Sequence, residues 1–439
     1  MIGLLIFAVA LAFLLLGYPV AFTFAAIGIA FVVIFAEPSQ LAQIPYRIYS
    51  NMGDNGEGIV LMAIPLFIFM GLILQRSNLA DQLLQSMGKL FGSVRGGLAI
   101  STVLVGSVLA ASTGVVGASV VAMGLISLPV MLRHNYRTEL ATGSIAAAGT
   151  LGQIIPPSIV LIILGDVLNI PVGDLFSAAL LPGLTLVGCY VLYILIYCRF
   201  YPDSAPPVLL QPDESRADIV ISALLAIVPP LALILFVLGS IFTGIATPTE
   251  SSALGCLGAI LLSALYKSFS LKMCWESARE TVKITAMVFA VLLGASLFSM
   301  GFSYSGGEEE IEKLLLSLPG GEWSFLCIIL LVIILLGFFL DYIEISYIVL
   351  PLVYPVVETL GINMTWFAIL VAMNLQTSFL TPPFGFALFY LKGVVPPSVS
   401  TMSIYRGVLP FIFVQVLVLL AILIFPELFN LERKAVALW

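Results

Sequence analysis

The chain has 439 residues, of which 61% are hydrophobic and 9% charged, and its formal net charge is −7. Soluble domains carry about 25% charged residues, so this composition excludes a water-coated globular protein and indicates a chain surrounded mostly by lipid bilayer. The negative charge and the lack of a basic stripe exclude an electrostatic nucleic-acid binder. One histidine and five cysteines without metal-ligand spacing argue against a metal centre, so we expect no bound cofactor.

Apolar stretches recur from one end of the chain to the other, and a membrane-crossing helix needs about 20 such residues. We therefore expect an all-α polytopic membrane protein. Its first helix is retained, because residues 1–17 lack the positive charge that opens a signal peptide. The predicted helices span residues 2–16, 18–36, 58–75, 97–111, 119–132, 138–154, 158–168, 176–199, 218–242, 251–266, 284–303, 323–340, 344–358, 364–380, 384–393 and 404–428.

The first half, residues 1–199, contains three features besides plain spanning helices. Residues 76–95 alternate charged with apolar side chains, which predicts an amphipathic arm at the membrane surface. Residues 97–132 contain two apolar stretches, each too short to cross, that meet at a polar tip, Ser112–Gly114. Residues 138–168 form a helix that is interrupted at Pro156-Pro157. We expect a re-entrant hairpin followed by a broken helix.

Residues 200–217 are polar and carry four prolines, which predicts a linker to the second half, residues 218–439. The second half contains the same features in the same order. They are an amphipathic arm at 267–283, a hairpin at 323–358 with its tip at Asp341–Ile343, and a broken helix at 364–393 with Pro382-Pro383. A final helix follows. The alternatives are two tight full crossings for each hairpin and a simple kink at each proline pair.

The two proline pairs are separated by 226 residues, and other paired features lie near the same offset. Residues 17–28 correspond to residues 244–255 at a shift of 227, and the two tips correspond as well. Side-chain identity between the halves is low, so the repeat rests on the order of the features. Two such halves predict an internal repeat of about 200 residues each.

Basic residues predict the orientation of each half, because cytoplasmic loops collect Lys and Arg. With the acidic loops 37–57 and 304–322 outside, four basic residues lie outside, namely Arg47, Lys313, Arg433 and Lys434. The cytoplasmic side collects Arg76, Lys89, Arg95, Arg133, Arg137, Arg199, Arg216, Lys267, Lys272, Arg279, Lys283, Lys392 and Arg406. Both termini then lie outside and the halves are inverted, as in many secondary transporters that bind their substrate at the midplane.

The two tips and the two breaks are expected to meet near the centre of the bilayer. Carbonyls freed by proline, together with hydroxyls, suit a hard cation, and helix N-termini suit an anion. Such a site fits a carboxylate or sulfonate carried together with sodium. A helix-packing role is the alternative for each hydroxyl. The candidate residues are Ser112, Thr113, Gly114, Thr150, Gly152, Gln153, Pro156, Asp341, Tyr342, Asn374, Gln376, Thr377, Ser378, Thr381 and Pro382.

Four acidic residues lie in or near apolar segments. Asp341 and Glu344 are functional candidates because ionisable groups in a membrane are costly, the alternative being a tip that reaches water. Asp166 is expected near the outer surface and solvated, and Glu250 is either a helix cap or a site contact. An intramembrane aspartyl protease would need Asp166 and Asp341 to face each other, which the predicted topology opposes. We therefore expect a transporter and not an enzyme.

Four motifs in order resemble a known family over essentially the whole chain. Residues 244–251 (GIATPTES), 154–158 (IIPPS), 380–385 (LTPPFG) and 339–341 (FLD) are similar to motifs of the large membrane subunit of tripartite ATP-independent periplasmic (TRAP) transporters, the DctM-like family. The resemblance implies a sodium-driven elevator in the bacterial inner membrane. It also implies a periplasmic substrate-binding protein and a small, DctQ-like membrane subunit, expected here as a separate chain. The alternative within transport is a sodium–anion symporter that needs no binding protein.

The resemblance also implies where the ligands bind. Sodium would be held at Ser112, Thr113 and Gly114 with Thr150, Gly152 and Pro156, and at Asp341 with Thr377, Thr381 and Pro382. Substrate would contact Ser112, Gln153, Asn374, Gln376, Ser378 and Thr381. This chain departs from the family at the first tip. Many members have a serine-rich tip followed by an aspartate, whereas Val120 and Val121 occupy that neighbourhood here. The sodium ligands at this tip would then be mostly hydroxyls and carbonyls, and the small organic anion is not identified.

Overall fold

The computed structural model describes residues 2–35, 38–52, 60–77, 79–208 and 216–434. These residues are helical and contain no strand, apart from one isolated bridge between Ile362 and Lys434, so the all-α prediction is confirmed. The first half contains α1 (Ile2–Leu15), α2 (Val20–Phe35), η1 (Pro38–Gln43), α3 (Ile44–Met52), α5 (Ala63–Arg76), α6 (Leu79–Phe91), α7 (Gly97–Thr113), α8 (Val116–Arg133), α9 (Thr138–Thr150), η2 (Leu151–Gln153), α10 (Ile159–Val167) and α11 (Val172–Phe200).

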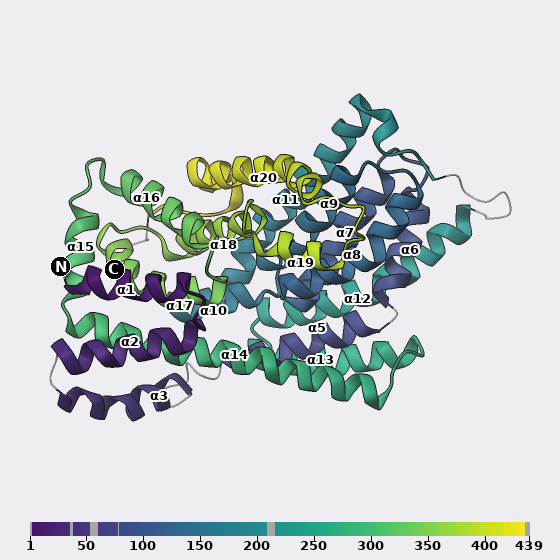
Figure 1. Ribbon diagram of the computed structural model, residues 1–439. Helices are drawn as coiled ribbons and strands as arrows, with labels where there is room; N and C mark the ends of the chain where they lie inside the picture. Colours follow the sequence, from purple (N-terminus) through teal and green to yellow (C-terminus); the bar gives the residue numbers. More distant parts are fainter. Residues whose placement is uncertain (1, 36–37, 53–59, 78, 209–215, 435–439) are drawn as a thin grey trace.

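The linker contains a short helix, η3 (Pro202–Ser204), and the second half follows it. Figure 1 shows how the helices of the two halves mix in space. The second half contains α12 (Arg216–Phe242), α13 (Pro248–Leu265), α14 (Leu271–Tyr304), α15 (Gly307–Leu316), α16 (Gly321–Leu336), α17 (Tyr342–Thr359), α18 (Met364–Leu380), α19 (Phe386–Val394), α20 (Thr401–Ile424) and η4 (Pro426–Phe429).

The first predicted amphipathic segment, 76–95, contains the separate helix α6, whereas the second and the two predicted outer loops differ from their predicted form. The predicted arm 267–283 is not separate, because α14 runs unbroken from Leu271 to Tyr304. The charges in its first turns are spaced for a helix, as in the Lys272–Glu276 pair at i,i+4, and no proline interrupts it. The predicted outer loop 304–322 contains α15, whose first turn holds three glutamates, where the helix dipole favours negative charge. The described part of the predicted loop 37–57 likewise contains η1 and α3.

Both predicted hairpins return to the end of the molecule from which they enter. At the base of the first, the Leu98 N–H donates to the Tyr136 hydroxyl (3.2 Å), which joins the start of α7 to the residues after α8. At the base of the second, the Lys434 ammonium contacts both the Glu322 carboxylate and the Leu360 carbonyl, at the start of α16 and the end of α17. The hairpins are therefore re-entrant, and Figure 1 shows them approaching the centre from opposite ends.

The two broken helices stop and restart at the predicted positions. α9 ends at Thr150, passes through the 3-10 turn η2, and α10 begins at Ile159, after Pro156-Pro157. α18 ends at Leu380, where Thr381 takes an extended backbone, and α19 begins at Phe386. Both Pro–Pro peptide bonds are cis. Each break leaves a stretch of irregular backbone inside the helical body, as the sequence predicted.

The halves are interleaved, and their contacts exchange in pairs. α2 packs on α14, and its counterpart α13 packs on α5. α8 packs on α19 while α17 packs on α10, and α9 packs on α20 while α18 packs on α11. An offset near 226 relates the members of each pair, so each of these contacts occurs twice with the roles reversed. Inverted repeats related by a two-fold axis produce this arrangement.

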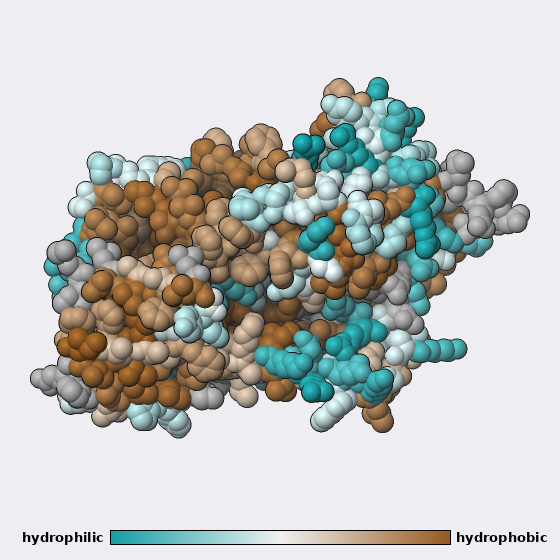
Figure 2. All heavy atoms as spheres, in the orientation of Figure 1, coloured by the Kyte–Doolittle hydropathy of each residue, from teal (hydrophilic) through white to brown (hydrophobic). Residues whose placement is uncertain are grey.

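The surface agrees with a membrane protein of several crossings. Seven helices in the described residues are long and apolar enough to span a membrane, namely α8, α11, α12 from Ala217, α13, α14, α17 and α20. Two of them, α8 and α17, are the second arms of the hairpins and turn back. Figure 2 shows hydrophobic residues over α1, α2 and α16, whereas hydrophilic residues gather at the other end, around the start of α14.

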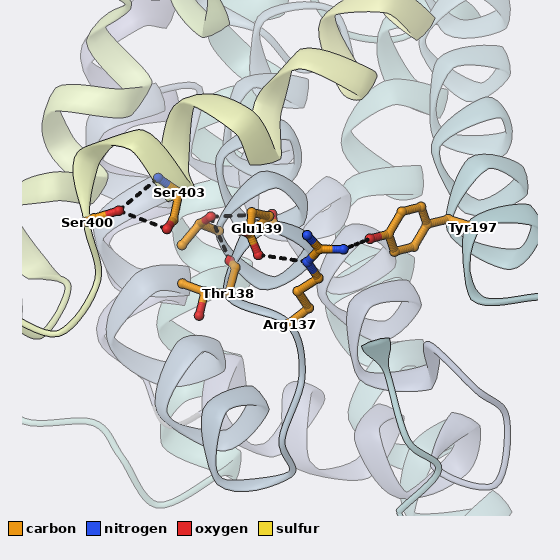
Figure 3. A network of polar contacts seen from close by, with 7 residues as sticks. Arg137, Thr138, Glu139, Tyr197, Ser400 and Ser403 are labelled. Carbon is orange, nitrogen blue, oxygen red and sulfur yellow. Dashed lines mark hydrogen bonds and ion pairs between the residues drawn. The ribbon is translucent and has the colours of Figure 1, made fainter. Parts of the chain in front are cut away.

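A close contact between α9 and α20 joins the two halves. A Cβ atom on Gly143 would collide with the Gly407 carbonyl, and one on Gly407 would collide with the Glu139 carbonyl. Figure 3 shows the polar groups at this junction. The Arg137 guanidinium donates to Glu139 (3.1 Å) and to the Tyr197 hydroxyl (3.4 Å) of α11. Backbone therefore meets backbone here, with side chains only around the rim.

Replacing Gly143 with valine is expected to lower the melting temperature of the purified protein. The added side chain has no room, and overpacking of this kind costs about 1–3 kcal/mol. Thermal unfolding in detergent measures the effect. Gly239→Ala in α12 is the control, because a Cβ there meets nothing within 4 Å. Equal melting temperatures for Gly143→Val and wild type would contradict the close α9–α20 contact.

Candidate functional site

A cavity of about 580 Å³ lies where both hairpin tips face two helices outside the hairpins. One wall is the first tip and the start of α8, and the second is the second tip together with the break between α18 and α19. The remaining wall comes from the end of α5 and the early turns of α14. The described lining residues are Leu72, Gln75, Arg76, Val115, Val116, Gly117, Ala118, Val121, Ala122, Leu125, Glu280, Ile284, Met287, Asp341, Tyr342, Phe379, Phe386 and Tyr390.

The first tip turns on Gly114. Its φ of +60° is in the left-handed region that glycine favours, and its N–H donates to the Ala110 carbonyl (2.9 Å). A Cβ on Gly114 would lie 2.8 Å from the Ile159 side chain, so this tip packs on the first turn of α10. The predicted side chains of Ser112 and Thr113 lie outside the part that the structure describes. The tip and the first break are thus in direct contact, as expected.

The second tip is closed by Asp341 and Glu344. The Asp341 carboxylate accepts a hydrogen bond from the Tyr342 N–H (2.7 Å), and the Asp341 N–H donates to Glu344 (3.0 Å). This reciprocal arrangement is a capping box at the start of α17. Asp341 is only partly buried and lines the cavity. Its carboxylate therefore has a structural role at the helix start and also faces the space where a ligand fits.

The predicted residues of the first break are buried and do not line the cavity. Thr150, Gly152, Gln153 and Pro156 are inaccessible to solvent. The Thr150 hydroxyl donates to the Ala147 carbonyl (2.9 Å). Both side-chain amide atoms of Gln153 are buried without a hydrogen-bond partner among the described residues. A buried amide without partners costs free energy, so Gln153 is placed for a water, an ion or a ligand.

The second break shows the same pattern. The hydroxyls of Thr377, Ser378 and Thr381 donate to carbonyls three or four residues earlier in the chain (2.7–2.9 Å). The Asn374 amide donates to the Leu330 carbonyl (2.8 Å) of α16, while its oxygen has no partner among the described residues. Pro382 follows Thr381 at the edge, where exposure begins. These hydroxyls behave as the helix-packing alternative describes, with oxygen lone pairs still available to a cation.

One hydrogen bond joins the two breaks directly. The Gln376 side-chain amide donates to the Thr150 hydroxyl (3.4 Å), and these residues are 226 positions apart. They are therefore equivalent residues of the two halves, and they meet where the two-fold axis passes. The Gln376 carbonyl oxygen is also buried without a partner in the described part of the chain. The predicted convergence of the two breaks is correct.

The cavity itself is lined differently from the prediction. Of the predicted site residues, Asp341 and Tyr342 line it, whereas Gln153, Asn374, Gln376 and Ser378 are fully buried and do not line it. The sequence reasoning missed Gln75, Arg76 and Glu280, which come from α5 and α14. The signal for Arg76 and Glu280 was weak, because they stand in the stretches 76–95 and 267–283, which predicted only surface exposure, and Gln75 ends the predicted helix 58–75. The structure turns these stretches toward the tips.

Two other acidic residues have a clear place. Glu250 forms a capping box with Thr247 at the start of α13, in which the Thr247 N–H donates to the carboxylate (2.8 Å). The cap interpretation of Glu250 is therefore right. Asp166 is partly buried and accepts a hydrogen bond from the Tyr347 hydroxyl (3.5 Å), which links α10 to α17. The sequence predicted a solvated Asp166. The structure instead shows its carboxylate bound by a residue of the second hairpin.

Re-entrant hairpins, broken helices and a cavity between them define a multi-pass membrane permease. The family model described as "Tripartite ATP-independent periplasmic transporter, DctM component" matches residues 7–428. The chain therefore belongs to this family and is a TRAP transporter large permease subunit, a transporter and not an enzyme. Membership places it in the bacterial inner membrane and implies partnership with a small membrane subunit and a periplasmic binding protein.

Several relatives cover nearly the whole chain. The C4-dicarboxylate TRAP transporter large permease protein DctM of Pseudomonas aeruginosa is 28% identical over 90% of each chain. The sialic acid large permease protein SiaM of Vibrio cholerae is 26% identical over 95% of each. The ectoine/5-hydroxyectoine large permease protein UehC of Ruegeria pomeroyi is 28% identical over 96% of each. Similar identity to permeases with three different substrate names leaves the substrate of this chain undecided by similarity.

The fold is also similar to a solved structure. The YdaH transporter of Alcanivorax borkumensis, whose crystal structure is described as having an unusual topology, superposes with a TM-score of 0.59. The match covers 88% of this chain and 90% of that chain at 15% identity. At this identity the likeness supports the arrangement of helices and nothing about the cargo.

Proposed function

We propose that this chain carries a small organic anion across the inner membrane together with sodium. The substrate class is a carboxylate, keto acid or sulfonate, delivered by a periplasmic binding protein. A separate, DctQ-like subunit braces the permease. The observation that carries the proposal is the cavity in which both hairpin tips face α5 and α14. Substrate held between two tips can be exposed on alternate sides if the body that carries the tips moves.

The support for sodium is the oxygen-rich chemistry of the breaks. Thr150, Thr377 and Thr381 present hydroxyl oxygens beside backbone freed by the proline pairs. The second tip adds the Asp341 carboxylate. Hard cations of low charge prefer such oxygen ligands. The first site would use Gly114, Gly152 and Pro156 with the side chains of Ser112 and Thr113, and the second would use Asp341 with Thr377, Thr381 and Pro382.

The support for an elevator is the division of the helices into two bodies. The hairpins pack on the broken helices, as in α7 on α9, α16 on α18 and α8 on α19. α11 and α20 also pack on the broken helices, whereas α2, α5, α13 and α14 pack on one another, as in α2 on α14 and α13 on α5. A side-chain hydrogen bond between the two bodies joins Gln75 of α5 to the Ala118 carbonyl (3.0 Å) at the start of α8. In this proposal the first body slides along the second.

Uptake into proteoliposomes tests the function. The permease, its small subunit and its binding protein are reconstituted, and uptake of succinate, pyruvate and isethionate is followed with and without an inward sodium gradient. We expect at least one anion to accumulate, and only with the gradient and the binding protein. Uptake that needs no binding protein would favour the alternative symporter. Accumulation of none of the anions, with a membrane-tight preparation, would contradict an organic-anion substrate.

A further inference from the structure

Arg76 is the one basic residue among the described residues that line the cavity between the tips. It is the last residue of α5, on the body that packs around the hairpins and broken helices. The other charged lining residues, Asp341 and Glu280, are acidic. An organic anion in this space therefore meets two carboxylates and a single guanidinium. The sequence had assigned Arg76 only to the cytoplasmic charge count.

The Arg76 guanidinium lines the cavity and, among the described residues, donates to one acceptor, Glu276. Its Nη1 lies 3.2 Å from Glu276 Oε2 on α14, and its side chain is 32% exposed. The preceding residue, Gln75, donates to the Ala118 carbonyl at the start of α8, so the last turn of α5 touches the moving body directly. A guanidinium has five N–H donors in a planar fork, and one contact with Glu276 leaves others for a second anion.

The partner of Arg76 is also easily released. Glu276 is 49% exposed and is shared with Lys272, whose Nζ lies 3.9 Å away. Exposed ion pairs of this kind contribute little to stability. A substrate carboxylate or sulfonate can therefore replace Glu276 on Arg76, while Glu276 keeps Lys272 and water as partners. Arg76 and Glu276 come from α5 and α14, so the exchange needs no movement of the hairpins.

We propose that Arg76 is the cationic contact of the transported anion, exchanging Glu276 for the substrate at the wall of the cavity. This inference rests on the proposed function, because it assumes an anionic cargo. It makes Arg76 a specificity-determining residue: a negatively charged cargo is favoured by the guanidinium, whereas an uncharged analogue gains nothing from it. Arg76 belongs to the body that stays in place while the hairpin tips move. The substrate therefore contacts Arg76 in only one of the two end states of transport.

Four variants of the reconstituted complex test the inference. Arg76→Gln removes the charge, and Arg76→Glu with Glu276→Arg reverses the pair while keeping a bridge between α5 and α14. Arg279→Gln is the matched control, since it removes an exposed arginine of α14 that does not line the cavity. Glu276→Gln removes the competing carboxylate. Succinate, pyruvate and isethionate are first tested on the wild type. KM is then measured for every variant with the anion that the wild type transports.

We expect Arg76→Gln to raise KM by about tenfold or more, the scale of one lost bond to a charged group. The reversed pair is expected to stay equally impaired, Arg279→Gln to keep the wild-type KM, and Glu276→Gln to lower KM. A reversed pair that restores the wild-type KM would make Arg76 a brace between helices and overturn the inference. A wild-type KM in Arg76→Gln would overturn it as well.

Binding without transport separates this inference from the proposed function. Thermal unfolding of the purified permease is measured with each anion added, at constant ionic strength and without a sodium gradient. Stabilisation of the wild type but not of Arg76→Gln supports the contact even if sodium-driven uptake fails. Failure of all three anions to stabilise the wild type, or equal stabilisation of both proteins, overturns the contact at Arg76.

Discussion

Asp341→Asn is expected to raise the sodium concentration for half-maximal uptake by about tenfold or more, the scale of one lost interaction with a charged group. The carboxylate caps α17 and also faces the cavity. Asparagine caps a helix as well as aspartate does, so this variant keeps the fold of the tip and removes only the negative charge. Initial rates of uptake into proteoliposomes across a sodium series measure the change.

The comparison with Asp341→Ala separates structure from chemistry. Alanine loses the cap as well, which costs about 0.5–2 kcal/mol, so its melting temperature should fall while that of Asp341→Asn should not. Glu250→Gln, in the capping box of α13 away from the cavity, is the control and should keep the sodium dependence of the wild type. An unchanged sodium dependence in both Asp341→Asn and Thr381→Ala would place the coupling ion elsewhere.

Gly152→Val is expected to abolish uptake and to lower stability together. A Cβ on Gly152 would lie 2.5 Å from the Ala110 carbonyl, so the first turn of the break touches the backbone of α7 four residues before Gly114. Any larger side chain must push the first hairpin away from the first break. Overpacking in a tight core costs about 1–3 kcal/mol, and a displacement of about 1 Å can cost about a hundredfold in rate.

Gly188→Val in α11 is the matched control, because a Cβ at that position meets nothing within 4 Å. The melting temperature and the initial rate of uptake are measured on both proteins at equal reconstitution. A functional, stable Gly152→Val protein would show that the first tip and the first break do not need to touch. That result would remove the first proposed sodium site, since its ligands come from both segments.

Local chemistry explains why so much of the fold was predictable from one sequence. Pro156-Pro157 and Pro382-Pro383 cannot continue a helix, whatever surrounds them. Asp341 within an apolar stretch marks a tip because an uncompensated charge in lipid is costly. The repeated order of these signals at a constant offset then predicted two related halves, and the exchanged contacts of α2 with α14 and of α13 with α5 agree.

The composition of the cavity wall could not be predicted in the same way. Arg76 and Glu280 stand in stretches whose charge pattern is equally compatible with a solvated surface helix. Gln153 and Asn374 show the same limit of a sequence pattern, because an amide side chain is polar whether it lines a cavity or is fully buried, as both are here. A one-dimensional pattern reports how polar a position is and not which neighbour it faces.

The sequence by itself determined a helical membrane protein with two hairpins, two broken helices and an inverted repeat, because hydrophobicity, proline and charge act within a few residues. Only the tertiary structure decided which residues face one another. In the tertiary structure Gln376 donates a hydrogen bond to Thr150, Gly114 packs against Ile159, and Arg76 lines the same cavity as the second tip. These contacts depend on how separate helices pack, and packing is a property of the whole chain.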